Sequence, residues 1–451
     1  MGPEPGHLAA DSRDREIPRR ENRRGNSAGI LAPLTVSGTI RVPGDKSISH
    51  RSLILASLAD GESRIRGILD SDDVRATAEV LRSLGAAIPP LADEMRVKGA
   101  GIRGLRPPRR ALDCANSGTT TRLLAGVVAA HPFSARFEGD ASLSRRPMQR
   151  VAEPLTYMGA RFEFEHGDGL PMTVHGVDLR SIDWDTHASS AQVKSAILLA
   201  GLISEVEVRV TEKSPSRDHT ERMLRAMGAD VEIDGNQVCL RPARRLNAIE
   251  IDVPADPSSA AFFVALASLA GGGELTLTDV CLNPTRTGFL DAMTRMGAQV
   301  DTTARRISGG EEIGSLRVRA APLRSTRITE AEVPSLIDEL PLLACVAAGA
   351  RIDLEITGAA ELRVKESDRI SAVVQNLRAV GADAEELPDG LRVHASRREL
   401  SGTIDPRGDH RIAMAFGILS AASGNRITVS NPDCVAVSYP RFWEDLRRVA
   451  A

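Results

Sequence analysis

The clearest feature of the hydrophobic pattern is an amphipathic segment that recurs along the chain and ends on glycine each time. In every copy an apolar residue, a glycine and an alanine follow apolar residues at helical spacing, with the glycines at Gly85, Gly159, Gly228, Gly297 and Gly381. Glycine just past such a run adopts the left-handed conformation that ends a helix. Residues 443–449 show the same pattern without the final glycine. The pattern therefore predicts six amphipathic helices.

A second and almost wholly apolar helix is predicted ahead of each amphipathic one. These apolar helices span residues 53–58, 123–130, 196–202, 261–270, 342–348 and 412–421. Short β-branched runs follow most of them, and alternating strand patterns with a turn follow most of the glycines, as in residues 230–240. The repeated unit is therefore helix, strand, helix, strand, strand, preceded by one strand. We expect the apolar helices to lie inside and the amphipathic ones outside.

Six copies of one mixed unit predict an α/β fold with two domains of three units each. Solenoids normally use shorter repeats, so a closed arrangement with pseudo-threefold symmetry is favoured. Residues 1–30 differ from the rest because they are rich in Arg, Asp, Glu, Gly and Pro and show almost no apolar periodicity. Such a composition cannot bury a core, and we predict a disordered charged tail.

Composition narrows the functional classes. A formal net charge of -3 and 3% aromatic residues argue against nucleic-acid binding. The 5 cysteines are scattered without a Cys-x-x-Cys pair, which is typical of a reducing cytosol and indicates no metal site. No apolar run reaches membrane-spanning length, and residues 260–270 are predicted to form a core helix. We expect a cytoplasmic monomer that binds neither nucleic acid nor membrane.

Every predicted apolar helix opens on small polar or charged residues. At the first one, Lys46 and Arg51 surround serines at a helix start, where free N–H groups and the helix dipole favour an anion. The alternative is an ordinary cap by Asp45 or Ser47, with Lys46 and Arg51 as solvated surface charges. The other openings span residues 116–122, 189–194, 256–259, 337–339 and 408–411.

Parallel packing of the apolar helices would bring these openings together. If the three helices of each domain run parallel, six helix starts point into one cleft between the domains and form an anion site. Charged loops ahead of the amphipathic helices add to it, at residues 145–147, 217–219, 283–286 and 363–369. For residues 363–369 the alternative is a salt-bridged helix face.

Asp338 and the group at residues 409–411 allow more than one interpretation. Asp338 could cap the helix that follows it or take part in proton transfer among the cations. Asp409 fits a cap, whereas Arg411 at a helix start opposes the dipole unless an anion is bound. His410 by itself favours a structural role. The chain has no Gly-x-x-x-x-Gly-Lys-Ser/Thr loop and no Gly-x-Gly-x-x-Gly after a strand, which argues against nucleotide-binding folds.

Taken together, these motifs resemble the 5-enolpyruvylshikimate-3-phosphate synthase family of enolpyruvyl transferases, from about residue 34 to the C-terminus. The resemblance rests on residues 44–51, 116–119, 146–147, 190–192, 362–369 and 409–411. It implies an inside-out α/β barrel of βαβαββ units with crossovers near residues 44 and 255. Domain I would then comprise residues 31–43 and 255–451, and domain II residues 44–254.

The resemblance also implies an activity. The enolpyruvyl group of phosphoenolpyruvate would move to the 5-hydroxyl of shikimate 3-phosphate, with release of phosphate and without metal or cofactor. This reaction belongs to the shikimate pathway, which leads to chorismate and the aromatic amino acids. Glu366, with Lys46 nearby, would protonate the alkene carbon, and Asp338 would take the proton of the attacking hydroxyl.

Site residues follow by position in the motifs. The catalytic residues would be Lys46, Asp338 and Glu366. The ligands of shikimate 3-phosphate would be Lys46, Ser47, Arg51, Ser189, Ser190, Gln192, Arg217, Asp338 and Lys365. The ligands of phosphoenolpyruvate would be Lys46, Gly118, Arg146, Gln192, Arg369 and Arg411.

Three positions bear on the details of this resemblance. Val437 stands where many members carry a lysine, and Glu361 stands where an asparagine is common. Gly118 stands where glyphosate-tolerant members tend to carry alanine, so we expect this chain to be a glyphosate-sensitive target.

Two rival functions remain at this point. A UDP-N-acetylglucosamine enolpyruvyl transferase would need a reactive cysteine within residues 138–147, and that loop has none; Cys114, at a predicted strand end, is expected to be buried. A non-catalytic anion-binding protein on the same fold would tolerate the loss of Asp338 and Glu366.

Overall fold

The computed structural model describes residues 1–2, 34–187, 189–422 and 426–450. The tail predicted to be disordered lies outside the described residues, apart from its first two positions. Both predicted classes of helix are present. The apolar helices are α1 (Lys46–Leu58), α3 (Gly118–Ala129), α5 (Ala191–Ser204), α7 (Pro257–Leu269), α10 (Leu340–Ala350) and α12 (His410–Ala421).

The amphipathic helices end where the glycines predicted. They are α2 (Asp72–Ser83), α4 (Gln149–Met158), α6 (His219–Ala226), α8 (Gly288–Arg295), α11 (Arg369–Ala379) and α13 (Phe442–Val449). All five predicted glycines follow such a helix with positive φ, from 86° at Gly85 to 123° at Gly159. Short helical turns complete the set, namely η1 (Leu143–Arg145), α9 (Val333–Leu336), η2 (Ile337–Glu339), η3 (Ala360–Val364) and η4 (Pro432–Val437).

The strands form six small sheets with one shared plan, in which the first strand runs parallel to the second and antiparallel neighbours follow. One four-stranded sheet contains, in spatial order, β4 (Leu112–Asp113), β5 (Ser134–Glu138), β7 (Met172–His175) and β6 (Arg161–Phe164). A second contains β8 (Ile182–Asp185), β9 (Val208–Thr211), β11 (Gln237–Leu240) and β10 (Val231–Asp234). A third contains β1 (Gly38–Ile40), β13 (Glu274–Cys281), β15 (Glu311–Arg319) and β14 (Gln299–Ser308). The fourth is β16 (Thr326–Ile328), β17 (Leu354–Ile356), β19 (Gly390–His394), β18 (Asp383–Leu387). The chain is thus a mixed α/β protein, and the hairpin predicted at residues 230–240 is confirmed.

Two of the sheets are smaller than the repeat predicts. One contains β12 (Glu250–Asp252), β2 (Glu62–Arg66) and β3 (Glu94–Lys98), and the other contains β20 (Ser401–Ile404) and β21 (Arg426–Val429). In the first, the missing strand is reduced to a single bridge between Ala87 and Lys98. Pro89 and Pro90 follow directly, and proline cannot donate a hydrogen bond to a sheet.

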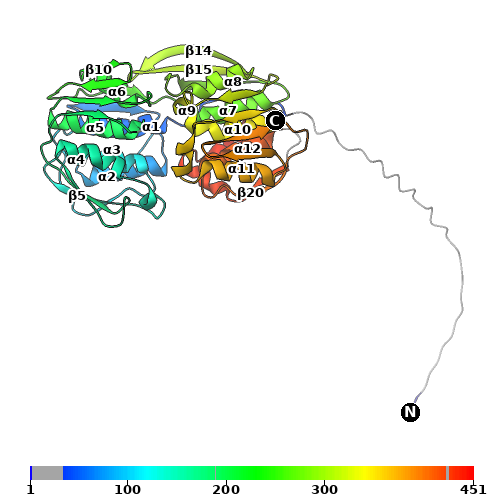
Figure 1. The fold of residues 1–451 in the computed structure, drawn as a ribbon, viewed down its shortest axis with the longest axis horizontal. Coiled ribbons are helices and arrows are strands. Elements are labelled where there is room, and N and C mark those ends of the chain that lie inside the picture. The colour runs from blue at the N-terminus through cyan, green and yellow to red at the C-terminus, as the bar shows by residue number, and fades with distance from the viewer. Residues whose placement is uncertain (3–33, 188, 423–425, 451) are drawn as a thin grey trace. The chain divides into compact units, whose positions relative to one another are not determined.

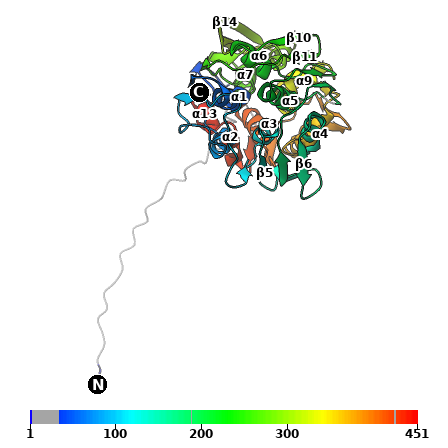
Figure 2. The same ribbon diagram turned by 90° about the vertical axis from the view of Figure 1, so that its left-hand side faces the viewer.

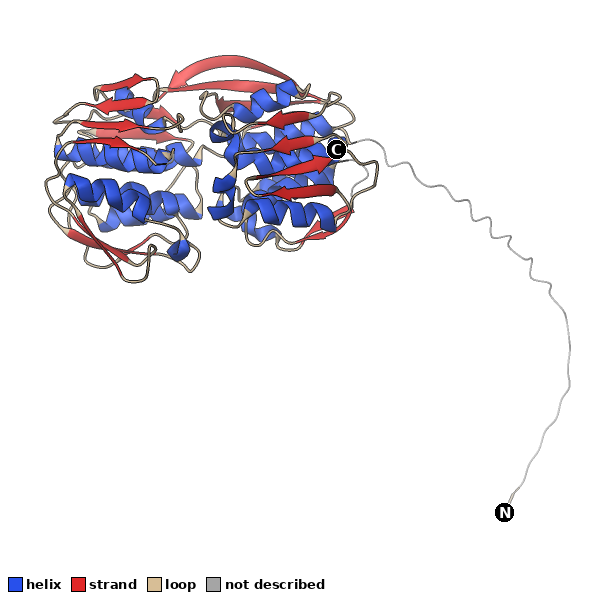
Figure 3. Cartoon of the chain, viewed as in Figure 1, coloured by secondary structure: helices blue, strands red, loops and turns tan. Residues whose placement is uncertain are grey.

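The apolar helices build two separate hydrophobic cores. We call the part with α1 to α6 half A, whose core draws on residues 48–253 and Cys281, and the part with β1 and α7 to α13 half B, whose core draws on residues 36–42 and 255–449. Figure 1 shows the helices of each half gathered together, and Figure 3 shows strands covering their outer sides. In Figure 2, α1, α3 and α5 lie in the middle with α2, α4 and α6 around them.

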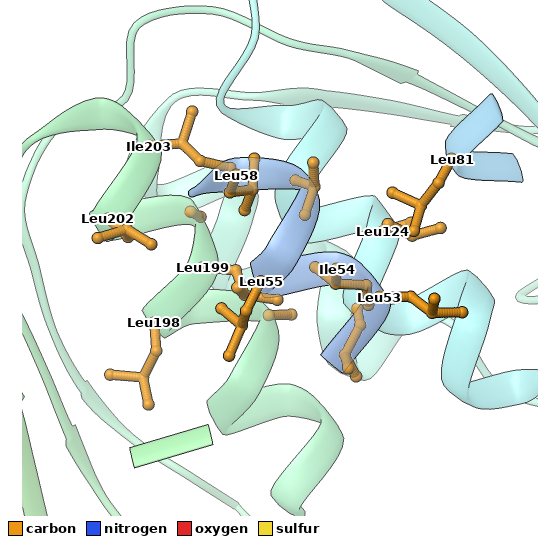
Figure 4. Packing of buried hydrophobic residues seen from close by; sticks show 14 of the residues in the cluster. Leu53, Ile54, Leu55, Leu58, Leu81, Leu124, Leu198, Leu199, Leu202 and Ile203 are labelled. Atoms are coloured by element: carbon orange, nitrogen blue, oxygen red, sulfur yellow. The ribbon is translucent and has the colours of Figure 1, made fainter. Parts of the chain in front are cut away.

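Close packing of leucine and isoleucine side chains holds the inner helices of half A together. Figure 4 shows Leu53 and Leu55 of α1 beside residues of α3 and α5, such as Leu124 and Leu199. All of these side chains are at most 1% exposed. Burial of a side chain of this size stabilises the fold by about 1.5–3 kcal/mol, so these contacts account for the inner position of the apolar helices.

The two halves exchange their first strands. β1 belongs to half B although α1 of half A follows it, and β12 pairs with β2 of half A although α7 of half B follows it. The two connecting segments meet at a bridge between Gly44 and Ala255. There the N–H of Asp45 donates to the carbonyl of Pro254 at 2.7 Å. The crossovers therefore lie side by side.

One buried arginine joins these crossovers. Arg286 donates to the carboxylates of Asp45 and Asp256, at 2.8 and 3.0 Å, and these aspartates cap α1 and α7. Replacing Arg286 by methionine would leave two buried carboxylates without a counter-charge. We expect the free energy of unfolding to fall by about 3–5 kcal/mol in guanidinium denaturation. Arg305→Met, which removes an exposed arginine paired with Glu312, should cost less than about 1 kcal/mol, and an equal loss would contradict this assignment.

One stretch departs from the expectation that no run is long enough to cross a membrane. Residues Val333–Ala350, comprising α9, η2 and α10, form 18 helical residues with a mean hydropathy of 1.5. In the sequence, Asp338 and Glu339 divide this stretch into two shorter apolar runs. Since 61% of it is buried, mostly against the core of half B, it is a core helix of a soluble fold.

Candidate active site

The start of α1 holds two cations that are not solvated surface charges. Asp45 caps the helix, because its Oδ1 accepts from the N–H of Ile48 at 2.9 Å. This confirms one part of the alternative interpretation, in which Asp45 is an ordinary helix cap and Lys46 and Arg51 are solvated charges. Lys46 Nζ lies 2.9 Å from Asp73 Oδ2, on α2. Arg51 is only 4% exposed and donates to Thr220 Oγ1 and Ser195 Oγ, so the rest of that interpretation is wrong. Ser47 accepts from Arg51 through its carbonyl at 3.0 Å.

The starts of α3 and α5 meet through polar side chains. Gln192 Nε2 donates to Thr119 Oγ1 at 3.0 Å, and Arg122 Nη1 donates to Gln192 Oε1 at 2.8 Å. A Cβ added at Gly118 would lie 2.9 Å from Arg122 Nη1 and 3.3 Å from Arg146 Nη1, so any side chain here would require these guanidinium groups to shift. Arg146 in turn donates to Asn116 Oδ1 at 2.8 Å.

Ser189 and Ser190 are tied to the loop that carries Arg217. Ser190 caps α5, while its own N–H donates to Glu212 Oε1 at 3.2 Å. Ser189 Oγ accepts from the N–H of Ser214 at 2.9 Å. These hydrogen bonds join the start of α5 to the segment that contains Glu212 and Ser214 and leads to Arg217.

Asp338 lies among cations from both halves. Its carboxylate is 2.5 Å from Arg217 Nη2 of half A, and 3.1 and 3.6 Å from Arg369 Nη1 and Arg411 Nη2 of half B. Asp338 does not cap α10, whose cap residue is Glu339 without a side-chain hydrogen bond. Burial alone would raise the pKa of Asp338, but Arg411, Arg217 and the other cations outweigh it and hold this pKa well below its usual range. The group is ionised at neutral pH.

Glu366 is the second carboxylate of this cluster. Its Oε2 accepts from Arg369 Nη2 at 2.6 Å, and Arg146 Nη1 of half A is 3.8 Å from its Oε1. Burial opposes ionisation, yet Arg369, His410, Arg146 and Lys46 hold the pKa of Glu366 well below its usual range. Glu366 therefore lies close to cations of both halves.

The salt-bridge interpretation of residues 363–369 holds for part of the segment. Arg363 pairs with Asp368 and Glu386 at 2.8 and 2.9 Å and is structural. Arg369 is different: it is 1% exposed and binds Asp338, Glu366 and Asp409 at once. Lys365 lies 3.8 Å from Glu361, and burial lowers the pKa of Lys365 although Asp338 and Glu361 oppose this shift.

These contacts bring together most of the predicted residues. A cavity of about 180 Å³ borders part of this set and is lined by residues of both halves, namely Ser142, Arg145, Arg146, Pro147, Val364, Lys365 and Glu366. A larger groove of about 570 Å³ runs along α2 from Asp72 to Ser83, and none of the predicted site residues lines it. The smaller cavity is therefore the one that borders predicted site residues, namely Arg146, Lys365 and Glu366.

Two buried histidines near the site are neutral and make stability sensitive to acid. Burial is the main cause that lowers the pKa of His50 to about 3 and of His410 to about 4, and Lys46 lowers both further. Their unfolded pKa is about 6.5, so below that pH the unfolded chain binds protons that the folded chain does not. The free energy of unfolding should fall as the pH drops from about 6.5 towards 4, by about 2 kcal/mol per histidine between pH 7 and 5.

The variant His50→Asn tests this prediction. His50 Nδ1 lies 2.6 Å from Thr77 Oγ1, and the asparagine amide can keep a hydrogen bond at that atom. Guanidinium denaturation at about pH 7 and pH 5 should show a smaller loss of stability for His50→Asn than for the unchanged chain. His166→Asn at an exposed position should leave the loss unchanged. An identical pH dependence in all three proteins would refute the prediction.

The sequence of the chain matches a known protein family. The family model described as EPSP synthase (3-phosphoshikimate 1-carboxyvinyltransferase) matches residues 31–446. This chain belongs to that family. It is 48% identical over 419 residues to the 3-phosphoshikimate 1-carboxyvinyltransferase of Persephonella marina, covering 92% of this chain and 97% of that protein.

Further relatives support the same membership. The chain is 49% identical over 409 residues to the enzyme of the same name from Xanthomonas campestris, covering 90% of this chain and 93% of that protein. A solved structure of EPSP synthase from Acinetobacter baumannii matches with a TM-score of 0.84 and 40% identity over 93% of this chain and 96% of that one. The family resemblance inferred from the motifs is confirmed.

Membership of the EPSP synthase family argues against the alternative function of a UDP-N-acetylglucosamine enolpyruvyl transferase, which would need a reactive cysteine. Cys114 directly follows β4 and is 0% exposed, as predicted, and burial raises the pKa of its thiol to about 12. Such a thiol is not a nucleophile at neutral pH. Among the described residues, no group of three or more His, Cys, Asp or Glu side chains could hold a metal ion.

The structure adds residues that the EPSP synthase motifs did not indicate. Asp73 is the partner of Lys46, yet in the sequence it is one of two acids in the first turn of α2, a common arrangement at helix starts. Arg122 is 7% exposed and lies beside Gly118; burial lowers its pKa to about 9. At the departures from the family pattern, Glu361 pairs with Arg150 of half A at 3.2 Å, and Val437 ends the turn η4.

Proposed function

We propose that this chain transfers the enolpyruvyl group of phosphoenolpyruvate to the 5-hydroxyl of shikimate 3-phosphate and releases phosphate. Family membership establishes the 3-phosphoshikimate 1-carboxyvinyltransferase class, as the sequence predicted. The observation that carries the mechanism is the placement of Asp338 and Glu366, two ionised carboxylates, among arginines from both halves. Two anionic substrates and two proton transfers need such a site.

Shikimate 3-phosphate binds mainly to half A in this proposal. Lys46, Ser47 and Arg51 of α1 and Ser189, Ser190 and Gln192 at the start of α5 offer cations, hydroxyls and helix N–H groups. Arg217 and Lys365 complete the ligands. Arg217 contacts Asp338 directly, so the bound 5-hydroxyl lies next to the base that takes its proton.

Phosphoenolpyruvate binds at the boundary between the halves. Lys46, Gly118, Arg146 and Gln192 reach it from half A, and Arg369 and Arg411 from half B. The 180 Å³ cavity beside Arg146 and Glu366 supports this placement, since it is bordered by groups of both charges. The cations also stabilise the carboxylate and phosphate of the tetrahedral intermediate.

Proton transfer requires the pKa of Glu366 to change when substrate binds. With Arg369 and Arg146 as its partners, Glu366 is ionised and cannot donate a proton. Bound phosphoenolpyruvate brings negative charge to the same arginines, which weakens their hold on Glu366 and raises its pKa. Glu366 then protonates the alkene carbon while Asp338 accepts the hydroxyl proton.

Movement of the halves completes the proposed enzyme. Half B corresponds to domain I (residues 31–43 and 255–451) and half A to domain II (residues 44–254), each an inside-out barrel of three βαβαββ units with pseudo-threefold symmetry. The shared sheet plan and the helix arrangement of Figure 2 support this interpretation. Closure about the adjacent crossovers assembles the site and excludes water. We propose a cytoplasmic monomer, acting in aromatic amino-acid biosynthesis.

A coupled phosphate-release assay tests the function. Phosphate should appear only when shikimate 3-phosphate and phosphoenolpyruvate are both present, and its yield should match the enolpyruvyl product. Shikimate 3-phosphate binding without turnover would instead support the non-catalytic alternative. Absence of both binding and turnover would overturn the proposal.

Gly118→Ala tests where phosphoenolpyruvate binds. The added methyl group would press on Arg122 and Arg146, at 2.9 and 3.3 Å, so the arginines must shift and phosphoenolpyruvate should bind more weakly. We expect its KM to rise about tenfold or more while the KM of shikimate 3-phosphate changes little. Glyphosate should inhibit the unchanged chain and lose potency against Gly118→Ala. Gly272→Ala is the control, because an added Cβ there meets nothing within 4 Å and the backbone does not require a positive φ; equal KM values in all three proteins would refute the assignment.

A further inference from the structure

A buried ionic cluster lies behind the start of α5 and takes no part in the proposed chemistry. It consists of Lys194 on α5, Glu212 after β9 and Glu221 on α6, which we call the Lys194 cluster. The Nζ of Lys194 is 2.7 Å from Glu212 Oε2 and 2.8 Å from Glu221 Oε1, and all three side chains are at most 3% exposed. Fully buried charges lose their hydration, so a cluster of this kind is weak evidence for a purely stabilising role.

Glu212 connects two segments of the proposed shikimate 3-phosphate site. Its Oε1 accepts from the N–H of Ser190 at 3.2 Å, and its Oε2 accepts from the N–H of Ser216 at 3.1 Å. Lys194 also donates to the carbonyl of Ser216 at 3.5 Å. One carboxylate, held by one lysine, therefore sets the distance between the cap of α5 and the residue next to Arg217.

Glu221 connects the same cluster to Arg51. The guanidinium of Arg51 donates to Thr220 and Ser195, which are the sequence neighbours of Glu221 and Lys194. Among the described residues, no carboxylate forms a hydrogen bond or ion pair with Arg51, and Glu221 supplies the strongest opposite charge acting on it. Burial raises the pKa of Glu221, and the charge of Lys194 at 2.8 Å opposes this shift, so Glu221 depends on Lys194 for its ionisation.

We propose that Lys194 is a positioning residue for shikimate 3-phosphate. Through Glu212 it holds the proposed ligand Ser190 and Ser216, which precedes the proposed ligand Arg217. Lys194 and Glu221 also lie next to Ser195 and Thr220, the two residues that bind the proposed ligand Arg51. This inference rests on the proposed function, because it assumes that these ligands bind shikimate 3-phosphate. The phosphoenolpyruvate ligands Gly118 and Arg146 have no contact with the cluster among the described residues, so the effect should be specific to one substrate.

Steady-state kinetics of Lys194→Met test the proposal. Loss of the lysine frees the loop before Arg217, and we expect the KM of shikimate 3-phosphate to rise about tenfold or more. The KM of phosphoenolpyruvate should change less than about twofold. An unchanged KM for shikimate 3-phosphate, or an equal rise for both substrates, would overturn the proposal.

A double variant separates positioning from stability. Lys194→Met leaves two buried carboxylates without their lysine, whereas Lys194→Met with Glu212→Gln leaves only one, Glu221. The double variant should recover much of any lost melting temperature while the KM of shikimate 3-phosphate stays high, because the bridge through Glu212 is still missing. Recovery of both quantities together would show that the cluster is only structural.

Arg217→Ala distinguishes failure of this inference from failure of the proposed site. Arg217 contacts Asp338 directly and is a proposed ligand in its own right. A raised KM for shikimate 3-phosphate in Arg217→Ala, but not in either Lys194 variant, would overturn the positioning role alone. An unchanged KM in Arg217→Ala would overturn the proposed binding site itself, and the inference with it.

Discussion

Asp338→Asn should reduce kcat by about 10²- to 10⁴-fold, the range expected for loss of a positioned general base. The substitution keeps the shape of the side chain but removes the charge that faces Arg217, Arg369 and Arg411. Asp338 lies between cations of both halves and has no helix-capping role. The coupled phosphate-release assay at saturating substrates measures the effect. Substrate binding should survive, because the cations remain.

Glu339→Gln is the matched control for this prediction. Glu339 is also a buried carboxylate and lies 3.5 Å from Arg411 Nη1, so its removal takes the same charge from the same arginine. It faces Arg411 without contacting Arg217, and we assign it no proton transfer. Its kcat should fall by less than about tenfold. Near-normal kcat in Asp338→Asn, or an equal fall in the two variants, would contradict the assigned base.

Lys46→Met should lower kcat/KM for phosphoenolpyruvate by about 10²- to 10⁴-fold. Its ammonium group lies at the start of α1 and pairs with Asp73, and the proposed function makes it a ligand of both substrates. Without it, the proposed phosphoenolpyruvate site loses one of its cations. Initial rates at varied phosphoenolpyruvate give the value.

Asp73 provides the control for stability. Lys46→Met alone leaves the buried carboxylate of Asp73 without its partner, which lies at 2.9 Å in the unchanged chain. Adding Asp73→Asn should therefore recover stability without recovering activity. Lys98→Met, at an exposed position on β3, should change neither. If Lys46→Met with Asp73→Asn were as active as the unchanged chain, Lys46 would have no role in the reaction.

Local patterns in the sequence predicted the secondary structure well. Glycine after an apolar run marked the ends of α2, α4, α6, α8 and α11, because the left-handed conformation at a helix end is a property of a few neighbouring residues. The apolar helices were equally clear, since a helix surrounded by others is apolar on all sides. The repeat is incomplete in two sheets, and in one of them Pro89 and Pro90 prevent a strand.

Such local patterns do not predict which residues contact each other when they are far apart in the sequence. Lys46 and Arg51 were singled out, but their neighbours Asp73, Thr220 and Ser195 were not. Likewise, Glu212 reads as an ordinary acid at a strand end, and only its burial beside Lys194 gives it a role. Spacing along the chain carries no information on these pairs because each joins separate helices.

The sequence by itself therefore determined the helices, their order, the family and the residue types that bind anions. Tertiary structure decided which charges face one another. Asp338 could cap α10 or meet cations as far as the sequence shows, and Arg411 together with Arg217 from the other half depresses its pKa. Capping and helix termination depend on a few adjacent residues, whereas ionisation depends on every charge within a few ångströms and on the water that burial removes.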